Sequence, residues 1–257
     1  MPNQSTNNEV NAIILAAGQG TRMNSSVSKV LHEVGNKTLI QHVIDAAMPL
    51  ASFINVIIGH NSESVKKSTQ SNLIKWVLQK NQLGTGHAVM QAIPNIKKDS
   101  MCLILYGDVP LIQTQTLLKL LEKANKTGFS LLTVIANDPS GYGRIIRDSS
   151  KSIQSIIEHK DANTEELEID EVNTGIMAIT GALLTKYLNQ LEPNNSQGEL
   201  YLTDIVEKAV KDNVNIASFI CENATEVMGI NDKNNLATAE RAYQLKIADE
   251  LMKDDLN

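Results

Sequence analysis

The sequence predicts an α/β fold with a mixed, mostly parallel central sheet that is flanked by helices. Two features of the 257-residue chain carry this prediction. In the first half, short apolar runs alternate with segments of helical periodicity, and the connections between them are short. The second half contains shorter runs that alternate apolar and polar residues, which indicates that strand directions are mixed there.

The apolar run 11–16 is followed by Ala17 and a glycine-containing loop, as is typical of a buried parallel strand. In the first half we expect further strands at 53–58, 74–78, 101–106 and 130–136, and helices at 38–50, 62–70, 86–93 and 117–126. In the second half we expect strands at 144–147, 152–158, 169–180, 214–220 and 225–228, and helices at 181–191 and 202–211. The alanine- and charge-rich segment 232–252 predicts a last helix, with Asp232 as its N-cap. The polar residues 1–10 are expected to form a tail.

Composition excludes several classes of function. There are 23 basic and 29 acidic residues, so the formal net charge is −6, which argues against binding to nucleic acid or an anionic membrane through a basic face. Cys102 and Cys221 lie far apart in no CxxC pattern, so neither a disulfide scaffold nor a structural zinc site is expected. No signal peptide or membrane span is visible, which makes a reducing cytoplasm the expected location.

The first chemical signal is the glycine-containing segment LAAGQGTRM at 15–23, directly after the first strand. Small residues let a ligand approach the backbone, whose N–H groups can surround phosphate oxygens. The segment is neither a Walker loop nor the dinucleotide fingerprint, because no Gly-Lys-Ser/Thr follows and the third glycine is missing. Arg22 and Lys29 add positive charge nearby. Taken alone, the segment fits a phosphate site and a tight turn equally well.

Two further segments carry chemistry in the first half. Gln79 begins the segment QKNQLGTGHA, and its amide could recognise the edge of a base, although a plain helix start capped by Thr85 is the alternative. Asp108 follows a buried strand, where a carboxylate is well placed to hold Mg²⁺, or else to cap a turn. Asn231 could supply a second metal ligand through its carbonyl oxygen, with helix capping as the alternative.

Polar side chains also lie beside the expected strands of the second half, in the segments 141–145, 158–161 and 173–176. Such side chains suit the hydroxyls and the amide of a sugar. Each segment taken singly is more simply a strand-end turn or a surface salt bridge.

The segment LAAGxGTRM, followed by Lys29-Val-Leu-His, resembles the signature of the sugar-1-phosphate nucleotidyltransferases. Ser28 departs from that pattern, because the family usually has proline before the lysine. From about residue 11 to 245, the ordered segments resemble the uridylyltransferase domain of the bacterial bifunctional GlmU family. The resemblance implies a Rossmann-like nucleotidyltransferase fold over 11–231, with a nucleotide half at about 11–110 and a sugar-binding half at about 111–231, followed by a C-terminal helix at 232–257.

The resemblance also implies a reaction, in which UMP passes from UTP to N-acetylglucosamine 1-phosphate and gives UDP-N-acetylglucosamine, a cell-wall and peptidoglycan precursor, and pyrophosphate. It implies that UTP is contacted by Leu15, Ala16, Ala17, Gly18, Gln79, Gly84 and Thr85. It assigns catalytic contacts with the phosphates to Arg22 and Lys29, and Mg²⁺ to Asp108 and Asn231. It implies sugar contacts from Tyr106, Gly143, Glu158 and Asn173.

Three alternatives stay open. The first is a uridylyl- or thymidylyltransferase for another sugar 1-phosphate, and the second is a catalytically silent regulator that binds a nucleotide sugar. The third, a glycosyltransferase, is disfavoured because Val109-Pro110 follows Asp108 where an Asp-x-Asp motif would be expected. The family's β-helix acetyltransferase domain has no counterpart in this chain, so acetyl transfer and a trimer are not expected, and the assembly state is left open.

Overall fold

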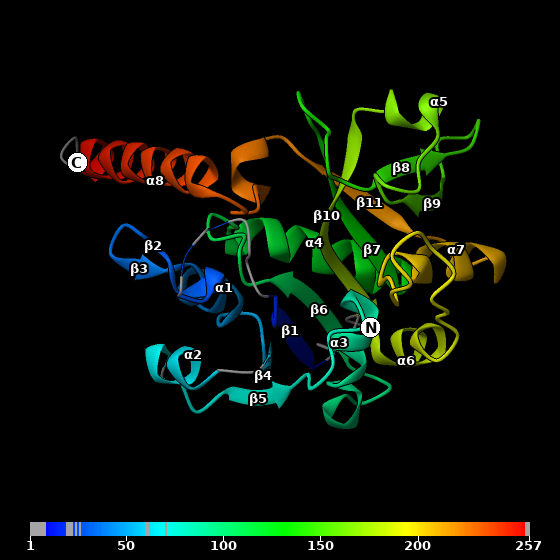
Figure 1. Cartoon of the computed structure of the whole chain (residues 1–257), viewed down its shortest axis with the longest axis horizontal. Helices are drawn as coiled ribbons and strands as arrows, with labels where there is room; N and C mark the ends of the chain where they lie inside the picture. The colour runs from blue at the N-terminus through cyan, green and yellow to red at the C-terminus, as the bar shows by residue number, and fades with distance from the viewer. Residues whose placement is uncertain are drawn as a thin grey trace, which may run out of the picture.

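The computed structural model describes residues 9–18, 23, 25, 27–59, 62–69 and 71–254. Within these ranges a nine-stranded sheet forms the centre of the molecule (Figure 1). Its main path has the order β11-β7-β10-β6-β1-β4-β5. The strands of this path are β1 (Val10–Ala16), β4 (Phe53–Ile58), β5 (Ile74–Leu78), β6 (Met101–Tyr106), β7 (Phe129–Ile135), β10 (Glu171–Thr180) and β11 (Ala217–Cys221).

The sheet is mixed but mostly parallel, which confirms the predicted fold class. β6, β1, β4 and β5 run parallel to one another, and β11 runs parallel to β7. β10 lies between β6 and β7 and is antiparallel to both. The amino end of β10 therefore meets the carboxyl ends of β6 and β1 at one edge of the sheet, which is where ligands bind in open α/β sheets.

Helices cover both faces of the sheet because side chains alternate along each strand. Ile14 packs in one buried cluster with residues of α1 (Leu39–Ala47) and α4 (Thr114–Thr127). Its neighbour Ile13 packs in a second cluster with residues of α3 (Thr85–Met90), α6 (Gly181–Leu188) and α7 (Asp204–Lys211). Both isoleucines are fully buried, so the two cores fix the strand end that carries the glycine-containing segment.

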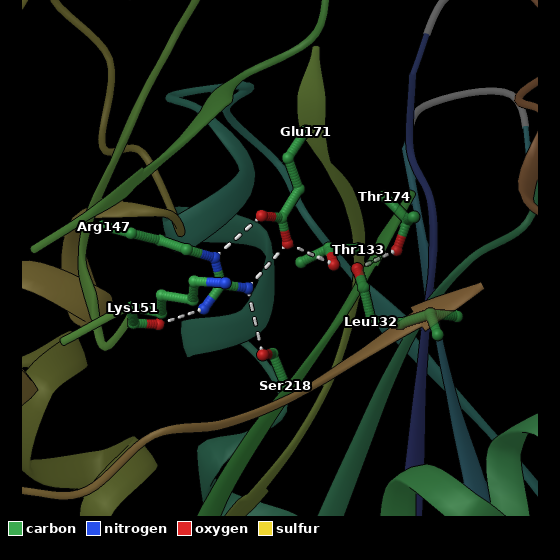
Figure 2. A network of polar contacts seen from close by, with 7 residues as sticks. All are labelled: Leu132, Thr133, Arg147, Lys151, Glu171, Thr174 and Ser218. Carbon is green, nitrogen blue, oxygen red and sulfur yellow. Dashed lines mark hydrogen bonds and ion pairs between the residues drawn. The ribbon is translucent and has the colours of Figure 1, made fainter. Parts of the chain in front are cut away.

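A hairpin of β8 (Arg144–Arg147) and β9 (Ile153–Ile157) extends the sheet beside β10, and α5 (Thr164–Leu167) follows it. Figure 2 shows how the polar network of Arg147 fastens this hairpin. Arg147 donates to both carboxylate oxygens of Glu171, at 2.7 and 2.6 Å, and to Ser218 Oγ at 3.1 Å. Thr133 Oγ1 donates to the same carboxylate at 2.7 Å. One carboxylate thus joins β8, β10 and β7, and the arginine reaches β11.

One predicted strand is a 3₁₀ helix in the structure, and several short elements were not predicted. Residues 225–228, predicted as a strand, lie largely in the 3₁₀ helix η4 (Ala224–Val227). The Asn223 side chain accepts from Thr225 N–H and its carbonyl accepts from Glu226 N–H, so these local bonds replace strand pairing. A small hairpin of β2 (Glu33–Val34) and β3 (Lys37–Thr38) was not expected, although Gly35 and Asn36 both adopt the positive φ that such a tight turn requires.

The remaining helices are α2 (Glu63–Ser68), the 3₁₀ helices η2 (Lys29–Leu31) and η3 (Ile93–Asn95), and the long α8 (Lys233–Asp254). Asp232 accepts from the N–H groups of Asn234 and Asn235 and so caps α8 as expected. The first half of α8 packs on the β2–β3 hairpin and its second half extends away from the sheet (Figure 1). None of the helices in the described ranges offers an apolar stretch long enough for a membrane crossing.

Asp204, the first residue of α7, provides a test of stability. Burial raises its pKa from 3.8 to about 6, and the neighbouring Glu158, Glu207 and Asp161 add to the effect while Lys208 opposes it. Asp204→Asn is therefore expected to stabilise the protein by about 1–2 kcal/mol at pH 8, because the native state no longer buries a charge. The melting temperature should rise by about 3–6 °C.

The gain from Asp204→Asn should shrink as pH falls through about 6, where the native carboxyl takes up a proton, and should vanish below about pH 3.8, where the unfolded carboxyl is protonated too. Thermal unfolding of both proteins between pH 8 and pH 3.5 measures this. Asp212→Asn, at the other end of α7, is the control, because an ion pair with Lys186 lowers the pKa of Asp212 and no gain is expected. Equal effects of the two substitutions would contradict the assignment to a buried charge.

Candidate active site

A cleft of about 520 Å³ opens at the edge of the sheet where β1 and β6 end and β10 begins. Every described residue to which the resemblance assigned a contact lines this cleft: Leu15, Ala16, Ala17, Gly18, Lys29, Gln79, Gly84, Thr85, Tyr106, Asp108, Gly143, Glu158, Asn173 and Asn231. Arg22 lies outside the described residues. The structure thus gathers the segments in one place, while the role of each residue stays a prediction.

Asp108 and Asn231 lie side by side although 123 positions separate them. The Ile230 N–H donates to the Asp108 carbonyl at 2.8 Å, and the Ile230 side chain is fully buried, so the chain is fixed just before Asn231. The Asp108 carboxylate and the Asn231 Oδ1 accept from the same Lys29 Nζ, the latter at 3.1 Å. Two oxygen atoms from distant segments therefore converge on one cation.

This pair of oxygens fits a hard divalent ion such as Mg²⁺, which binds one or two protein groups and keeps the other positions for water and phosphate oxygens. Within the described ranges, no three His, Cys, Asp or Glu side chains gather into a metal site. A cation held here would therefore leave most of its coordination sphere to a ligand. Lys29 and Asp108 are each only 15% exposed, so their interaction is partly shielded from water.

One wall of the cleft is formed by backbone and amide groups. Gln82 Nε2 donates to the Ala17 carbonyl, which ties the second glycine-containing turn to the first. Gln79 is buried, and its amide nitrogen lies 3.2 Å from the Gly84 carbonyl and 3.1 Å from His87 Nδ1, so its orientation is fixed. Gly84 has φ +107°, and a side chain there would lie 2.5 Å from the Leu200 carbonyl oxygen. Glycine is therefore required at this turn.

The opposite wall is formed by Tyr106 and by the start of β10. Gly175 has φ +80°, and the Tyr106 ring packs so closely on it that a Cβ would lie 2.4 Å from the ring. Asn173 Oδ1 accepts from Gly175 N–H at 3.0 Å, and Asn173 N–H donates to the Gly143 carbonyl at 2.8 Å. Burial raises the pKa of Tyr106, and the Glu158 and Asp108 carboxylates raise it further, so its hydroxyl stays protonated.

Glu158 contributes the acid of this wall. Burial raises its pKa above the ordinary value, and Asp161 raises it further, while a hydrogen bond from Thr203 Oγ1 at 2.9 Å opposes the shift. Thr203 therefore orients one carboxylate oxygen. A carboxylate, an amide and a phenol on one wall suit a ligand that carries several hydroxyl groups.

Gln82, Tyr142 and Gly175 also line the cleft, although none had been proposed as a site residue. Gln82 and Gly175 lie inside two of the segments that were singled out from the sequence. Gln82 could have been proposed there because it is a polar residue beside a glycine-containing turn. Tyr142 lies beside Gly143, and burial raises its pKa, with Asp108 adding to the shift. That proximity to Asp108 depends on the folded chain.

Comparison with known proteins agrees with this geometry. Residues 12–167 match the family described as the MobA-like NTP transferase domain. The chain is 50% identical over 249 residues to the bifunctional protein GlmU of Vesicomyosocius okutanii subsp. Calyptogena okutanii, with 97% of this chain and 55% of that protein covered. The GlmU protein of Ruthia magnifica subsp. Calyptogena magnifica is 48% identical, with 96% and 55% covered. The chain thus spans about half the length of these curated relatives.

Solved structures show the same fold. A UDP-glucose pyrophosphorylase complexed with UDP-glucose matches with a TM-score of 0.74 at 18% identity, over 93% of this chain and 99% of that one. A putative glucose-1-phosphate thymidylyltransferase from Bacillus anthracis matches with a TM-score of 0.72 at 20% identity, over 91% and 94%. The family match covers more than half of the chain and confirms the resemblance read from the motifs. The chain belongs to the family of MobA-like NTP transferase domains and has the Rossmann-like fold of nucleotidyltransferases.

Proposed function

We propose that this protein transfers UMP from UTP to N-acetylglucosamine 1-phosphate and releases pyrophosphate. The observation that carries the proposal is the convergence of Lys29, Asp108 and Asn231 beside the glycine-containing segment, in a cleft whose opposite wall offers hydroxyl-binding groups. The relatives named GlmU support the choice of substrates, because half of the residues are identical to one of them over nearly the whole chain. A role in cell-wall and peptidoglycan precursor synthesis in the cytoplasm belongs to the same proposal.

In the proposed reaction, a phosphate oxygen of the sugar 1-phosphate attacks the α-phosphorus of UTP, and the bond to the leaving pyrophosphate breaks. The attacking oxygen is already anionic, so the protein needs no strong general base. Its task is to align two polyanions and offset their repulsion. The backbone N–H groups after β1 and the Lys29 ammonium would provide this, together with Arg22, which the sequence places beside them.

Asp108 and Asn231 would hold Mg²⁺, whose charge helps bring the two phosphates together when it is bound. Gln79 would bind the base, since its amide is fixed by Gly84 and His87 and offers a planar polar group. Glu158, with Thr203 orienting it, and Asn173 would bind the sugar. The Tyr106 hydroxyl, which stays protonated, would donate to a ligand oxygen.

A pyrophosphate-release assay tests the proposal by crossing the four nucleoside triphosphates with several sugar 1-phosphates in the presence of Mg²⁺. We expect turnover to be greatest with UTP and N-acetylglucosamine 1-phosphate. The assay also includes dTTP as a fifth nucleotide. A preference for glucose 1-phosphate or for dTTP would favour the alternative transferases, the kind of enzyme that the names of the two solved structures describe. Binding of UDP-N-acetylglucosamine without pyrophosphate release from any pair would instead indicate a regulator.

A further inference from the structure

Among the described residues, Arg144 in β8 is the largest fully buried side chain, with 1% of its surface exposed. In the described part of the chain no carboxylate forms an ion pair with it. Its guanidinium instead donates to main-chain carbonyls: Nη1 to Pro139 at 2.7 Å and to Tyr142, and Nη2 to Leu167 at 3.4 Å. Its Nε is buried without a hydrogen-bond partner. The charge is therefore compensated mainly by peptide dipoles, with a weaker Coulombic contribution from the Asp138 carboxylate.

Such an arrangement is a poor means of filling space. Burying a charge without an ion-pair partner is costly, so packing alone does not explain an arginine at this position. The planar fork of the guanidinium can donate to several acceptors at once, and an apolar residue cannot reproduce this geometry. Here the fork joins two carbonyls of the segment 139–143 to the end of α5.

The segment 139–143 forms part of the cleft. Gly141, Tyr142 and Gly143 line it. The Gly143 carbonyl accepts from Asn173 N–H, and a Cβ on Gly143 would lie 3.4 Å from Glu158 Oε2. Arg144 thus binds the side of this segment that faces away from the cleft. The other side faces Asn173 and Glu158, which are proposed to bind the sugar.

We propose that Arg144 is a positioning residue for the sugar 1-phosphate, and that its guanidinium holds the segment 139–143 against Asn173 and Glu158. The inference rests on the proposed function. It predicts that loss of the fork weakens binding of the sugar phosphate and leaves binding of the nucleotide nearly unchanged, because Gln79, Gly84 and Lys29 come from other segments.

Arg144→Lys and Arg144→Met test the proposal, because lysine keeps the charge without the fork and methionine fills the space without either. Arg147→Lys is the matched control. It changes an arginine of the same strand whose partners Glu171, Ser218 and Lys151 do not line the cleft (Figure 2). For both Arg144 variants we expect the KM for N-acetylglucosamine 1-phosphate to rise at least tenfold, with UTP affinity in calorimetry within about twofold of the wild type.

Thermal unfolding of both Arg144 variants separates positioning from stability, because a merely structural role would lower the melting temperature and leave the KM for the sugar phosphate unchanged. Any of three results would overturn the proposal. The Arg144 variants could lose stability with an unchanged KM, Arg147→Lys could change the KM equally, or the affinities for UTP and for the sugar phosphate could fall in parallel. If the wild type shows no turnover, the proposed function fails. Amide exchange at 140–143 in the free protein still tests whether Arg144 holds this segment, because exchange should then be faster in both Arg144 variants and unchanged in Arg147→Lys.

Discussion

Asp108→Asn is expected to lower the rate of pyrophosphate release by about 10²- to 10³-fold. Asp108 supplies the only negative charge of the Asp108–Asn231 pair. Among the described residues, no group of three His, Cys, Asp or Glu side chains forms another metal site that could replace it. Asparagine keeps the size and one oxygen of the side chain, so the loss reports the charge. The measurement is turnover at saturating UTP and sugar 1-phosphate over a range of Mg²⁺ concentrations.

Asp45→Asn is the control for Asp108→Asn, because Asp45 forms an ion pair with Lys37 at a half-exposed site outside the cleft. Its activity should match that of the wild type. Excess Mg²⁺ should restore part of the activity of Asp108→Asn if the substitution weakens metal binding. Full activity of Asp108→Asn at low Mg²⁺ would refute the assignment of the metal to this pair.

Lys29→Met is expected to change two quantities in opposite directions. Turnover should fall by about 10²- to 10³-fold, because a positive charge beside the phosphates is lost. Divalent cations should bind more tightly to the substrate-free protein, because the Lys29 ammonium interacts with the same two oxygens that a metal would use. In the proposed site the ammonium and a metal ion would therefore compete until a phosphate ligand attracts the lysine.

Binding of Mn²⁺ to the substrate-free protein, followed by electron paramagnetic resonance of the free ion, measures this competition. We expect the dissociation constant of Lys29→Met to be severalfold lower than that of the wild type, since repulsion between like charges at the site is removed. Lys37→Met serves as the control, because Lys37 pairs with Asp45 outside the cleft. Weaker Mn²⁺ binding by Lys29→Met would show that the lysine supports the metal instead of competing with it.

The sequence predicts the parts of the fold that local pattern determines. The strand 11–16 was expected from its apolar run, and the structure shows β1 (Val10–Ala16) between two buried cores. The prediction of a strand at 225–228 was wrong, because Asn223 forms local hydrogen bonds that the pattern of apolar residues does not reveal. Pattern thus identifies elements that are stabilised by burial better than those stabilised by a single side chain.

The candidate site was predictable to a lesser degree from the residues themselves. Asp108 could be placed at a strand end, but its approach to Asn231 depends on the backbone bond from Ile230 and on packing that no spacing encodes. Residue chemistry offered Asn231 as a second metal ligand, with helix capping as the alternative, and the resemblance to a family then assigned both residues to Mg²⁺. Arg144 shows a different limit. Its segment 141–145 is most simply read as a strand-end turn or a surface salt bridge, whereas the structure buries this side chain against main-chain carbonyls that accept its hydrogen bonds.

The reversed direction of β10 separates two tasks that one sheet edge has to perform. β1 and β6 enter the cleft at their ends, whereas β10 enters it at its beginning, after the excursion through β8, β9 and α5. Residues 137–170 can therefore be lengthened, shortened or exchanged while the register of β1 with β6 stays intact. Under the proposed function, changes in this excursion would alter the choice of sugar phosphate while the groups proposed to bind the nucleotide stay unchanged.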